Sequence, residues 1–396
     1  MSQNSTPLPR KQVLLVVGTR PEAIKLAPIY RTLQTSTVLS PVLLSTGQHR
    51  EMLRQTFDVF GLTPDHDLDL MTPGQTLPDL NAKALVEISR YLAAHPPAAV
   101  LVQGDTTTVL AASMAAFYNR IPVGHVEAGL RTYDLQSPFP EEMNRRLASP
   151  LCRWHFAPTE PSRENLLREN IPPANIHVTG NTVIDSLLWV REKLQQNSIS
   201  IPALSARLSI SDTFRQQFLE TTHRPWLLVT GHRRESFGQG FEDICQALIR
   251  IATEHPDIGI LYPVHLNPNV REPVQRILSQ HPRICLAVPA AYEDFVWLMD
   301  RCHFILSDSG GVQEEAPSLG KPVLILRDTT ERPEGVTAGT CRLVGTDPAR
   351  IVSETALLLS DSAEYSRRSG LKNPYGYGNA SATITRVLEE ALAKNS

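Results

Sequence analysis

Sequence patterns of the commonest cofactor sites are missing from this chain. The turn GTRPEAIKLAPI, which follows the first predicted strand, lacks the GxGxxG pattern of dinucleotide-binding folds, and the phosphate-binding pattern GxxxxGK[ST] occurs nowhere. The cysteines are scattered without a CxxC pair: Cys152, Cys245, Cys285, Cys302 and Cys341. Neither a zinc site nor a disulfide framework is indicated, and the thiols are expected to be reduced. We therefore expect no cofactor and no metal.

The chain also lacks strong charge and long apolar runs. Lys and Arg total 38 against 41 Asp and Glu, a formal net charge of −3, which gives no footprint for nucleic-acid binding. No stretch reaches the ~20 apolar residues that a membrane-spanning helix needs. Residues 1–12 are polar and lack the apolar centre of a secretory signal. These absences predict a cytoplasmic protein without a membrane or nucleic-acid partner.

Short apolar strands alternating with amphipathic helical stretches fill most of the 396 residues. This length predicts two domains of roughly 180 residues each. Their continuous apolar character suits parallel strands covered on both faces. The expected strands are 13–19, 41–47, 99–105, 123–129, 155–159 and 176–181, then, after a polar segment at about 195–223, 226–232, 259–265, 284–289, 304–311, 322–328 and 341–345. The pattern predicts two doubly wound α/β domains in tandem.

Polar side chains gather where these strands end, which is where parallel α/β sheets bind ligands. The segment Asp308–Gly311, DSGG, reads as a strand end, a glycine turn and a helix start. Close backbone approach, the Ser309 hydroxyl and free helical N–H groups favour a diphosphate there. Glu314 and Glu315 follow and are able to accept hydrogen bonds from ribose hydroxyls. The alternative is an ordinary capped turn with acidic residues that suit the helix dipole.

Three carboxylates at predicted strand ends or loop exits suit proton transfer: Asp105, Glu127 and Glu141. Asp105 could instead be a helix N-cap. The three could also form a metal cluster, but no nearby spacing matches a standard metal motif, and Arg131 and Arg145 favour an anion.

Basic residues follow the first strand of each predicted domain. Arg20 and Lys25 lie near a helix N-terminus and suit a phosphate-bearing substrate, although Lys25 alone would more often be a solvated helix residue. In the second domain His232 stands beside Arg233 and Arg234, before a Ser- and Gly-bearing loop. His232 is a candidate for phosphate contact or acid–base work, although a lone His at a strand end is more often structural.

Ten segments, in order, carry a family resemblance: GTRPEAIKLAPI, TGQHREM, QGDTTT, GHVEAGLRT, SPFPEEMNRRL, TGNTVID, TGHRRESFG, YPVHLNPNV, SDSGGVQEEAPSLGKPVLILRDTTERPEG and AGTCRLVGTD. Together they resemble the bacterial non-hydrolysing UDP-N-acetylglucosamine 2-epimerase family. The resemblance implies the glycosyltransferase-B architecture, with Rossmann-like domains at 1–180 and 181–375, a cleft between them, and a C-terminal helix at about 376–396 returning to the first. It also implies a homodimer that interconverts UDP-N-acetylglucosamine and UDP-N-acetylmannosamine for surface polysaccharide precursors.

Residue roles follow from the same resemblance. The acid–base set would be Asp105, Glu127 and Glu141, with His232 beside the departing diphosphate. The nucleotide sugar would be bound by Arg20, Lys25, Arg233, Ser309, Gly310, Gly311, Glu315 and Arg332. A second, activating UDP-N-acetylglucosamine would be bound by Gln48, His49, Arg145 and His265. This sequence departs from the family at Tyr133, where glycine is familiar, and at Tyr377, where aspartate is frequent.

Three other functions fit parts of the pattern. A glycosyltransferase of the same architecture would need an acceptor pocket and has no use for three clustered carboxylates. A hydrolysing epimerase would release N-acetylmannosamine and UDP. A UDP-sugar sensor without chemistry would not need the acid–base residues.

Overall fold

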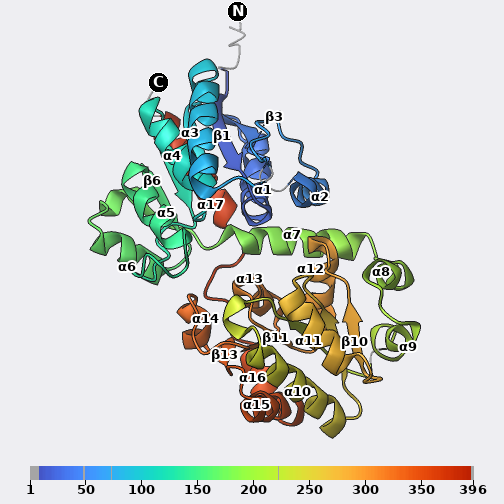
Figure 1. Ribbon diagram of the computed structural model, residues 1–396. Coiled ribbons are helices and arrows are strands. Elements are labelled where there is room, and N and C mark those ends of the chain that lie inside the picture. The colour runs from blue at the N-terminus through green and yellow to red at the C-terminus, as the bar shows by residue number, and fades with distance from the viewer. Residues whose placement is uncertain (1–8, 48–49, 73, 222, 394–396) are drawn as a thin grey trace, which may run out of the picture. The chain divides into compact units, whose positions relative to one another are not determined.

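Two compact α/β units make up the chain in this computed structural model, which describes residues 9–47, 50–72, 74–221 and 223–393 (Figure 1). Unit 1 comprises Met1–Ser186 and Tyr375–Ser396, and unit 2 comprises Leu187–Pro374. Each unit has its own parallel sheet covered by helices. The predicted α/β class with two doubly wound sheets is confirmed.

Unit 1 is built on a seven-stranded sheet in the order β3-β2-β1-β4-β5-β6-β7, with every pairing parallel. The strands are β1 Lys11–Val17, β2 Leu39–Ser45, β3 His66–Asp67, β4 Ala99–Gln103, β5 Val123–Val126, β6 Trp154–Ala157 and β7 Ile176–Val178. The helices are α1 Arg20–Thr35, α2 Arg50–Phe60, α3 Leu77–Ala94, α4 Thr107–Tyr118, α5 Glu141–Ala148, α6 Glu160–Arg168 and α17 Ala380–Ala393. Central strands such as β4 are buried along their whole length because helices cover both faces.

Helix α17 belongs to unit 1 although almost 200 residues of unit 2 precede it in the chain. Ile384, Leu388 and Leu392 recur every four residues and form its buried stripe, which packs against α1. Polar contacts fix the same helix at two points. Lys11 Nζ donates to the Leu392 carbonyl (2.7 Å), and the Ser36 hydroxyl donates to Glu389 Oε1 (2.5 Å).

Unit 2 has a six-stranded parallel sheet in the order β10-β9-β8-β11-β12-β13. The strands are β8 Trp226–Thr230, β9 Gly259–Pro263, β10 Ile284–Ala287, β11 Ile305–Ser307, β12 Val323–Ile325 and β13 Cys341–Leu343. The helices are α8 Ile201–Leu208, α9 Asp212–Phe214, α10 Gln239–Glu254, α11 Pro268–Leu278, α12 Tyr292–Arg301, α13 Gly310–Glu315, α14 Pro333–Ala338, α15 Pro348–Ser360 and α16 Ser362–Ser369. Helix α7, Thr182–Gln196, begins in unit 1 and ends in unit 2.

In each sheet the strand order reverses next to the first strand of the unit. The reversal lies between β1 and β4 in unit 1 and between β8 and β11 in unit 2. Loops that leave neighbouring strands at such a point diverge, and ligands of doubly wound folds bind there. The segments that follow β1, β4, β8 and β11 carry Arg20, Asp105, His232 and Ser309, so these predicted site residues flank a switch point.

All twelve predicted strands are present, and most end before the predicted residue. The strand expected at 99–105 ends at Gln103, and the one expected at 123–129 ends at Val126. Asp105 and Glu127 therefore lie on loops just beyond the sheet. The two-residue strand β3 was not predicted, because its sequence is His-Asp and carries no apolar pattern.

No helix in the described part of the chain is both long and apolar enough to cross a membrane.

Candidate active site

Asp105 lies on the loop between β4 and α4, where it faces helix α5. Its Oδ2 is 2.8 Å from Arg145 Nη2, and its carbonyl accepts a hydrogen bond from Asn144 Nδ2 (2.9 Å). The helix cap is the next residue, since the Thr106 side chain accepts from the Val109 amide (3.3 Å). The alternative interpretation of Asp105 as an N-cap is therefore wrong. Asp105 remains partly exposed and is held by a buried arginine.

Glu127 follows β5 in the left-handed region, with φ at +64°, and is 8 % exposed. Its carboxylate accepts hydrogen bonds from Lys25 Nζ and Gln103 Nε2, and from Asn181 Nδ2 at 3.1 Å. Lys25 is equally buried, so its interpretation as a solvated helix residue is wrong. The ammonium and the carboxylate of this pair lie beneath the loop that carries Asp105. Gly104, the residue before Asp105, is so close that a Cβ there would be 3.7 Å from Glu127 Oε2.

Glu141 and Glu142 begin helix α5 and have different surroundings. Glu142 is fully buried and accepts hydrogen bonds from the amides of Thr132 (3.1 Å) and Tyr133 (3.0 Å), so it fixes the preceding loop. Glu141 Oε2 is buried, and the described residues provide no hydrogen-bond partner for it. Glu127, by contrast, is hydrogen-bonded on both oxygens.

Two further residues near these carboxylates change the sequence-based interpretation. Arg131 is paired with Glu169 through two 2.7 Å contacts, so its guanidinium is engaged within the fold and does not support an anion site. Glu22 was missed: it accepts from the Gly18 and Thr19 amides (2.8 and 2.5 Å) and from the Thr106 hydroxyl (2.6 Å).

Burial raises the pKa of Glu22 despite these hydrogen bonds. The side chain links the loop that carries Arg20 to the loop that carries Asp105. Thr19 and Glu22 have the spacing of a capping box, and that pattern would have signalled the residue in the sequence.

Two buried histidines lie side by side in the sheet below the Asp105 loop. His125 on β5 and His155 on β6 are register partners, and the His125 ring contacts the Gly104 carbonyl (Nε2 to O, 2.7 Å). Burial lowers the pKa of His125 to about 4 and that of His155 to about 3. Both rings are thus neutral at physiological pH.

This pair predicts acid sensitivity. Unfolded chains take up protons on both rings near pH 6.5, whereas the folded chain excludes them down to about 4 and 3. The free energy of unfolding should fall by about 1.4 kcal/mol per pH unit for each histidine as the pH drops below 6.5. Urea unfolding at a series of pH values measures this slope. His155→Phe should reduce this slope by the contribution of one histidine, about 1.4 kcal/mol per pH unit. An unchanged slope would contradict a neutral, buried His155 in the folded chain.

In unit 2, Asp308 organises the loop after β8. Its Oδ2 accepts hydrogen bonds from the amides of His232 (2.7 Å) and Arg233 (2.8 Å), and its Oδ1 is 3.2 Å from His232 Nδ1. Burial alone would raise the pKa of Asp308, but these contacts outweigh burial and lower it. The ring of His232 stacks on that of His265, with centroids 5.7 Å apart. His232 is thereby oriented by a buried carboxylate that the sequence analysis treated only as part of a turn.

Arg233 and Arg332, both predicted to bind the nucleotide, contact Glu331 together with Arg327. Its carboxylate contacts Arg327 (2.7 Å), Arg332 (3.1 Å) and Arg233 (3.3 Å). Burial alone would raise the pKa of Glu331, but the three guanidinium groups lower it to about 2. Arg332 also contacts Glu314 (2.6 Å) and lies so close to Gly310 that a Cβ there would be 2.6 Å from its Cζ. A larger residue at position 310 would therefore have to displace the Arg332 guanidinium.

Ser309 and Glu315 flank the same turn. Ser309 is the N-cap residue of α13, but its side chain makes no capping hydrogen bond, so the capped-turn interpretation of its hydroxyl is wrong. Glu315 is buried and accepts a hydrogen bond from the Tyr292 hydroxyl (2.8 Å). This contact fixes one oxygen of a carboxylate predicted to face a ribose.

A family model described as UDP-N-acetylglucosamine 2-epimerase matches residues 31–389. The chain belongs to the UDP-N-acetylglucosamine 2-epimerase family. It is 55 % identical over 378 residues to the UDP-N-acetylglucosamine 2-epimerase of Escherichia coli O157:H7. The aligned region covers 96 % of this chain and 98 % of that relative.

Solved structures agree with this assignment. The UDP-GlcNAc 2-epimerase from Neisseria meningitidis bound to UDP-GlcNAc is similar with a TM-score of 0.86 at 47 % identity, over 96 % of this chain and 100 % of that one. The Methanocaldococcus jannaschii UDP-GlcNAc 2-epimerase in complex with UDP-GlcNAc and UDP has a TM-score of 0.78 at 32 % identity, over 96 % and 99 % of the two chains. The predicted family is confirmed.

The residues that the epimerase resemblance assigns to a second nucleotide sugar are divided between the units. Gln48 and His49 lie outside the described residues. Arg145 is paired with Asp105 in unit 1, and His265 stacks on His232 in unit 2. Each described member of this set therefore touches a candidate catalytic residue.

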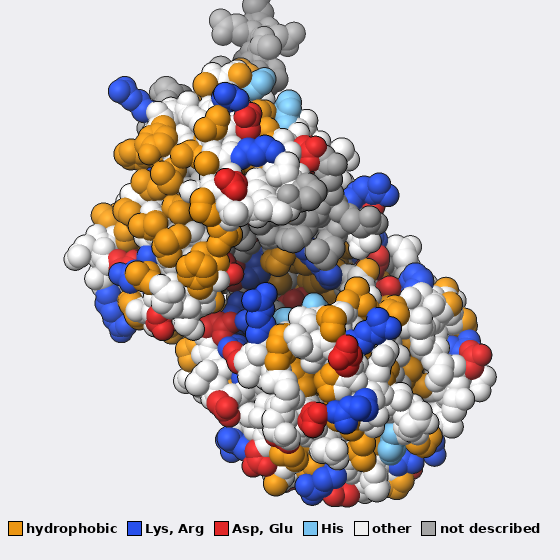
Figure 2. All heavy atoms as spheres, viewed as in Figure 1, with side chains coloured by type: hydrophobic (Ala, Val, Ile, Leu, Met, Phe, Trp, Pro, Cys, Tyr) orange, Lys and Arg blue, Asp and Glu red, His pale blue; other side chains and the backbone are white. Residues whose placement is uncertain are grey.

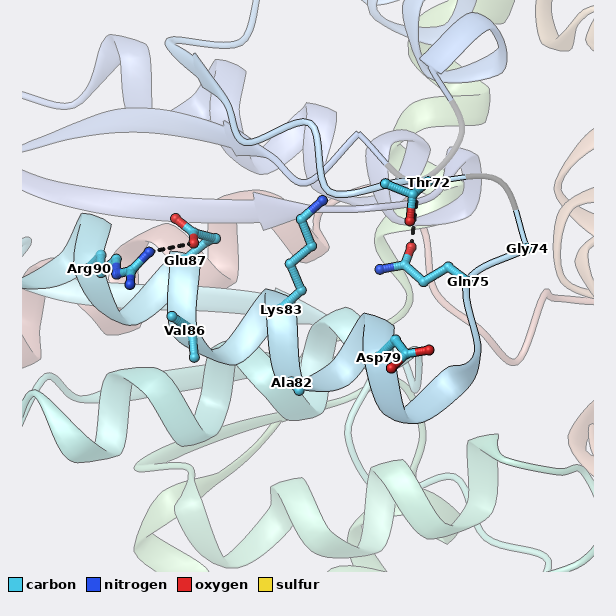
Figure 3. Close-up of a pocket in the computed structure, with 9 residues that line it drawn as sticks. All are labelled: Thr72, Gly74, Gln75, Asp79, Ala82, Lys83, Val86, Glu87 and Arg90. Carbon is cyan, nitrogen blue, oxygen red and sulfur yellow. Dashed lines mark hydrogen bonds and ion pairs between the residues drawn. The ribbon is translucent and has the colours of Figure 1, made fainter.

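A separate open groove runs along helix α3 (Figure 3). Lys83 Nζ donates to the Leu70 carbonyl (2.9 Å) on one side, and Arg90 pairs with Glu87 (2.7 Å) further along the helix. As far as the structure describes its lining, the groove includes none of the residues predicted for this epimerase site. No grouping of three or more His, Cys, Asp or Glu residues suited to a metal ion occurs within the described ranges.

Proposed function

We propose that this chain is a non-hydrolysing UDP-N-acetylglucosamine 2-epimerase, which interconverts UDP-N-acetylglucosamine and UDP-N-acetylmannosamine. The observation that carries the proposal is the carboxylate set of unit 1, set beside family membership. Asp105 and Glu127 follow β4 and β5, Glu141 begins α5, whose Arg145 contacts Asp105, and the buried Oε2 of Glu141 has no hydrogen-bond partner among the described residues. A family whose solved members bind UDP-N-acetylglucosamine needs such groups to move a proton at C2.

The proposed chemistry is elimination followed by readdition. A carboxylate removes the C2 proton, the C–H electron pair forms the C1=C2 double bond, and the C1–O bond breaks with its electrons leaving on UDP. The intermediates are 2-acetamidoglucal and UDP. A proton then returns to the opposite face of C2 while the UDP oxygen attacks C1, so atoms and charge balance over the cycle.

We assign proton removal to Glu141, because a base needs a free lone pair at the reacting atom. Asp105, beside Arg145, and Glu127, beside Lys25, are assigned to proton delivery on the other face. Lys25 is assigned to act indirectly, through its ion pair with Glu127. Arg20 is assigned to stabilise negative charge on the substrate. These roles belong to unit 1, the proposed acid–base domain.

Unit 2 is the proposed nucleotide-binding domain. The Ser309 hydroxyl and the amides of Gly310 and Gly311 are assigned to the diphosphate, and Glu315 to the ribose. Arg233, Arg332 and His232 stabilise the charge that develops on the departing UDP. Preorganised donors of this kind lower the activation barrier by several kcal/mol in total. Removal of one such donor typically raises the barrier by about 3 kcal/mol. Glu331 and Asp308 supply that preorganisation.

Proton NMR in deuterated water tests the function. Purified protein with UDP-N-acetylglucosamine alone should form UDP-N-acetylmannosamine that carries deuterium at C2. Epimer without deuterium would contradict elimination with solvent exchange. UDP with free N-acetylmannosamine would indicate a hydrolysing epimerase, and an inert nucleotide sugar would favour a glycosyltransferase or a sensor.

Unit 1 has an apolar surface for the dimer that the resemblance implies. Exposed apolar side chains occur on α3 (Val86), α4 (Phe117, Tyr118) and α5 (Leu147), three helices that pack in sequence. Figure 2 shows hydrophobic side chains gathered over this part of the unit. We propose that a second copy of the chain covers it.

Light scattering should give the mass of a dimer for the wild-type chain. The double variant Phe117→Glu, Tyr118→Glu should give that of a monomer, since two buried charges oppose association. Leu357→Glu, which alters an exposed apolar residue on α15 of unit 2, is the matched control and should stay dimeric. A dimeric Phe117, Tyr118 variant would place the interface elsewhere.

We further propose regulation by a second UDP-N-acetylglucosamine that contacts Gln48, His49, Arg145 and His265. The initial forward rate should then be sigmoidal in UDP-N-acetylglucosamine, and the reverse reaction should stall without a trace of it. A hyperbolic curve with an unaided reverse reaction would contradict activation.

The cytoplasm is the proposed location, because all five cysteines are free and buried, as in a reducing compartment.

A further inference from the structure

Asn181 occupies the place where two distant segments of unit 1 meet. It directly precedes α7. Its side-chain Oδ1 accepts a hydrogen bond from the backbone amide of Val183 (3.1 Å), and its backbone N–H donates to the Tyr375 carbonyl (2.7 Å). The chain leaves unit 1 just after the first turn of α7 and returns at Tyr375. One residue thus caps the outgoing helix and holds the returning segment.

The remaining group of this side chain is directed at the active site. Asn181 Nδ2 donates to Glu127 Oε1 (3.1 Å), and the residue is only 2 % exposed. The amide is divided between two tasks, with its oxygen on the helix and its nitrogen on the carboxylate. An ionised aspartate could perform only the first of these tasks.

The same helical turn is fixed to the segment that carries Lys25. The Ser186 hydroxyl donates to the carbonyl of Ile24 (2.5 Å), the residue before Lys25. Asp185 accepts from the amide and hydroxyl of Ser381 on α17 (2.8 and 2.5 Å). Both members of the Lys25–Glu127 pair are therefore attached to the start of α7, which is itself anchored in unit 1.

We propose that Asn181 is a positioning residue, which acts through Glu127 and sets the orientation of its carboxylate for proton delivery. The inference rests on the proposed epimerase function. Glu127 itself has a left-handed backbone conformation and faces Gly104, which has no side chain to restrict it. Lys25 and Gln103 hold one oxygen each, and the Asn181 hydrogen bond is the third restraint, on the oxygen that also contacts Lys25. A misplacement of about 1 Å at a reacting group is able to lower a rate ~10²-fold.

Asn181→Asp separates this role from helix capping. Asp and Asn are equally good N-caps, so folding should be unaffected. The new carboxyl, however, replaces the donor with an acceptor about 3 Å from Glu127, and two such carboxyls share a proton instead of both ionising. At pH 8 kcat should fall about 100-fold with KM within about twofold, and a drop to pH 6 should restore at least about tenfold, because the shared proton remakes the hydrogen bond.

Two variants serve as controls. Asn181→Ser keeps a capping side chain but is too short to donate to Glu127, so it should lose activity without recovery at low pH. Ser200→Asp adds a carboxyl at the N-cap of α8 in unit 2 and should retain wild-type kcat. The ionisable groups around the altered position are Lys25 on α1, Glu127 after β5 and Asp185 on α7, and only the pair with Glu127 predicts a recovery below pH 7.

Wild-type kcat at pH 8 in Asn181→Asp would overturn the proposal. So would a loss that does not recover relative to the wild type at pH 6, since a purely structural role has no such pH dependence. A carbon-13 NMR titration of the side-chain carboxyls is independent of turnover. Asn181→Asp should titrate in two coupled steps that involve Glu127. Independent titration would refute the contact even if the wild type proved inactive as an epimerase.

Discussion

Replacement of Glu141 by glutamine is expected to lower kcat by ~10²–10⁴, the usual contribution of a general base, with little change in thermal stability. The reason is the unpartnered oxygen. Glu141 Oε2 is buried and has no hydrogen-bond partner among the described residues, so an amide at this oxygen breaks no hydrogen bond to them. An amide, however, cannot accept a proton at pH 7. The measurement is the initial rate of UDP-N-acetylmannosamine formation together with the melting temperature.

The chain offers a matched control and an informative neighbour. Glu160 is the first residue of α6, as Glu141 is of α5, and Glu160→Gln should leave both rate and stability unchanged. Glu142→Gln should instead lower the melting temperature, because Glu142 holds two loop amides. Near-normal turnover of Glu141→Gln would remove Glu141 as the base and transfer that role to Asp105 or Glu127.

Lys25→Met is expected to destabilise the protein by about 3–5 kcal/mol, the typical effect of removing one partner from a buried ion pair. Lys25 and Glu127 are both at least nine-tenths buried, so the remaining carboxylate cannot be solvated by water. Gln103 and Asn181 still donate to it but carry no charge. Urea unfolding measures the loss, and activity should disappear with it.

The double variant Lys25→Met, Glu127→Gln separates charge from packing. If the unpaired carboxylate causes the loss, neutralising it should recover at least about 2 kcal/mol, a coupling energy typical of contacting residues. Equal destabilisation of the single and double variants would mean that Lys25 contributes only through packing of its aliphatic chain. In that case Lys25 would again be a candidate for direct contact with the diphosphate.

The fold followed from the sequence wherever burial is continuous. Strands such as 99–103 and 226–230 are apolar in all but their last residue, so their existence and parallel pairing were predictable. The residues at which the strands end were not predictable. A strand ends where the backbone of a polar residue finds hydrogen-bond partners in a loop instead of in the neighbouring strand. Gly104, with φ at +79°, turns the chain away before Asp105, and no alternation of apolar residues marks that point.

The site residues were predictable from their chemical type and position, but their partners were not. The Lys25–Glu127 pair joins residues 102 positions apart, and the Arg131–Glu169 pair joins residues 38 apart. Nothing local distinguishes the structural arginine from Arg145, which contacts Asp105. The three-dimensional arrangement alone separates an arginine paired with a candidate catalytic carboxylate from one paired elsewhere in the fold.

Tyr133 illustrates a departure whose physical meaning emerged only with the backbone. It has φ at +63°, a conformation that suits the glycine familiar in the family and costs other residues about 1–2 kcal/mol. Its hydroxyl donates to Asn165 Oδ1 (2.9 Å), and its amide donates to Glu142. These contacts offset the strained conformation at this position.

The position of α17 also affects how the protein is made. Unit 1 lacks the helix that covers α1 until residues 380–393 have left the ribosome, long after Ser186. At ~5–20 residues per second, the intervening stretch of nearly 200 residues takes about 10–40 s to translate. During this interval the apolar face of α1 is uncovered in the nascent chain, while unit 2, which is continuous in sequence, is able to fold first. The unit that carries the proposed catalytic carboxylates is therefore completed last, and nascent chains are expected to need chaperone protection until α17 docks.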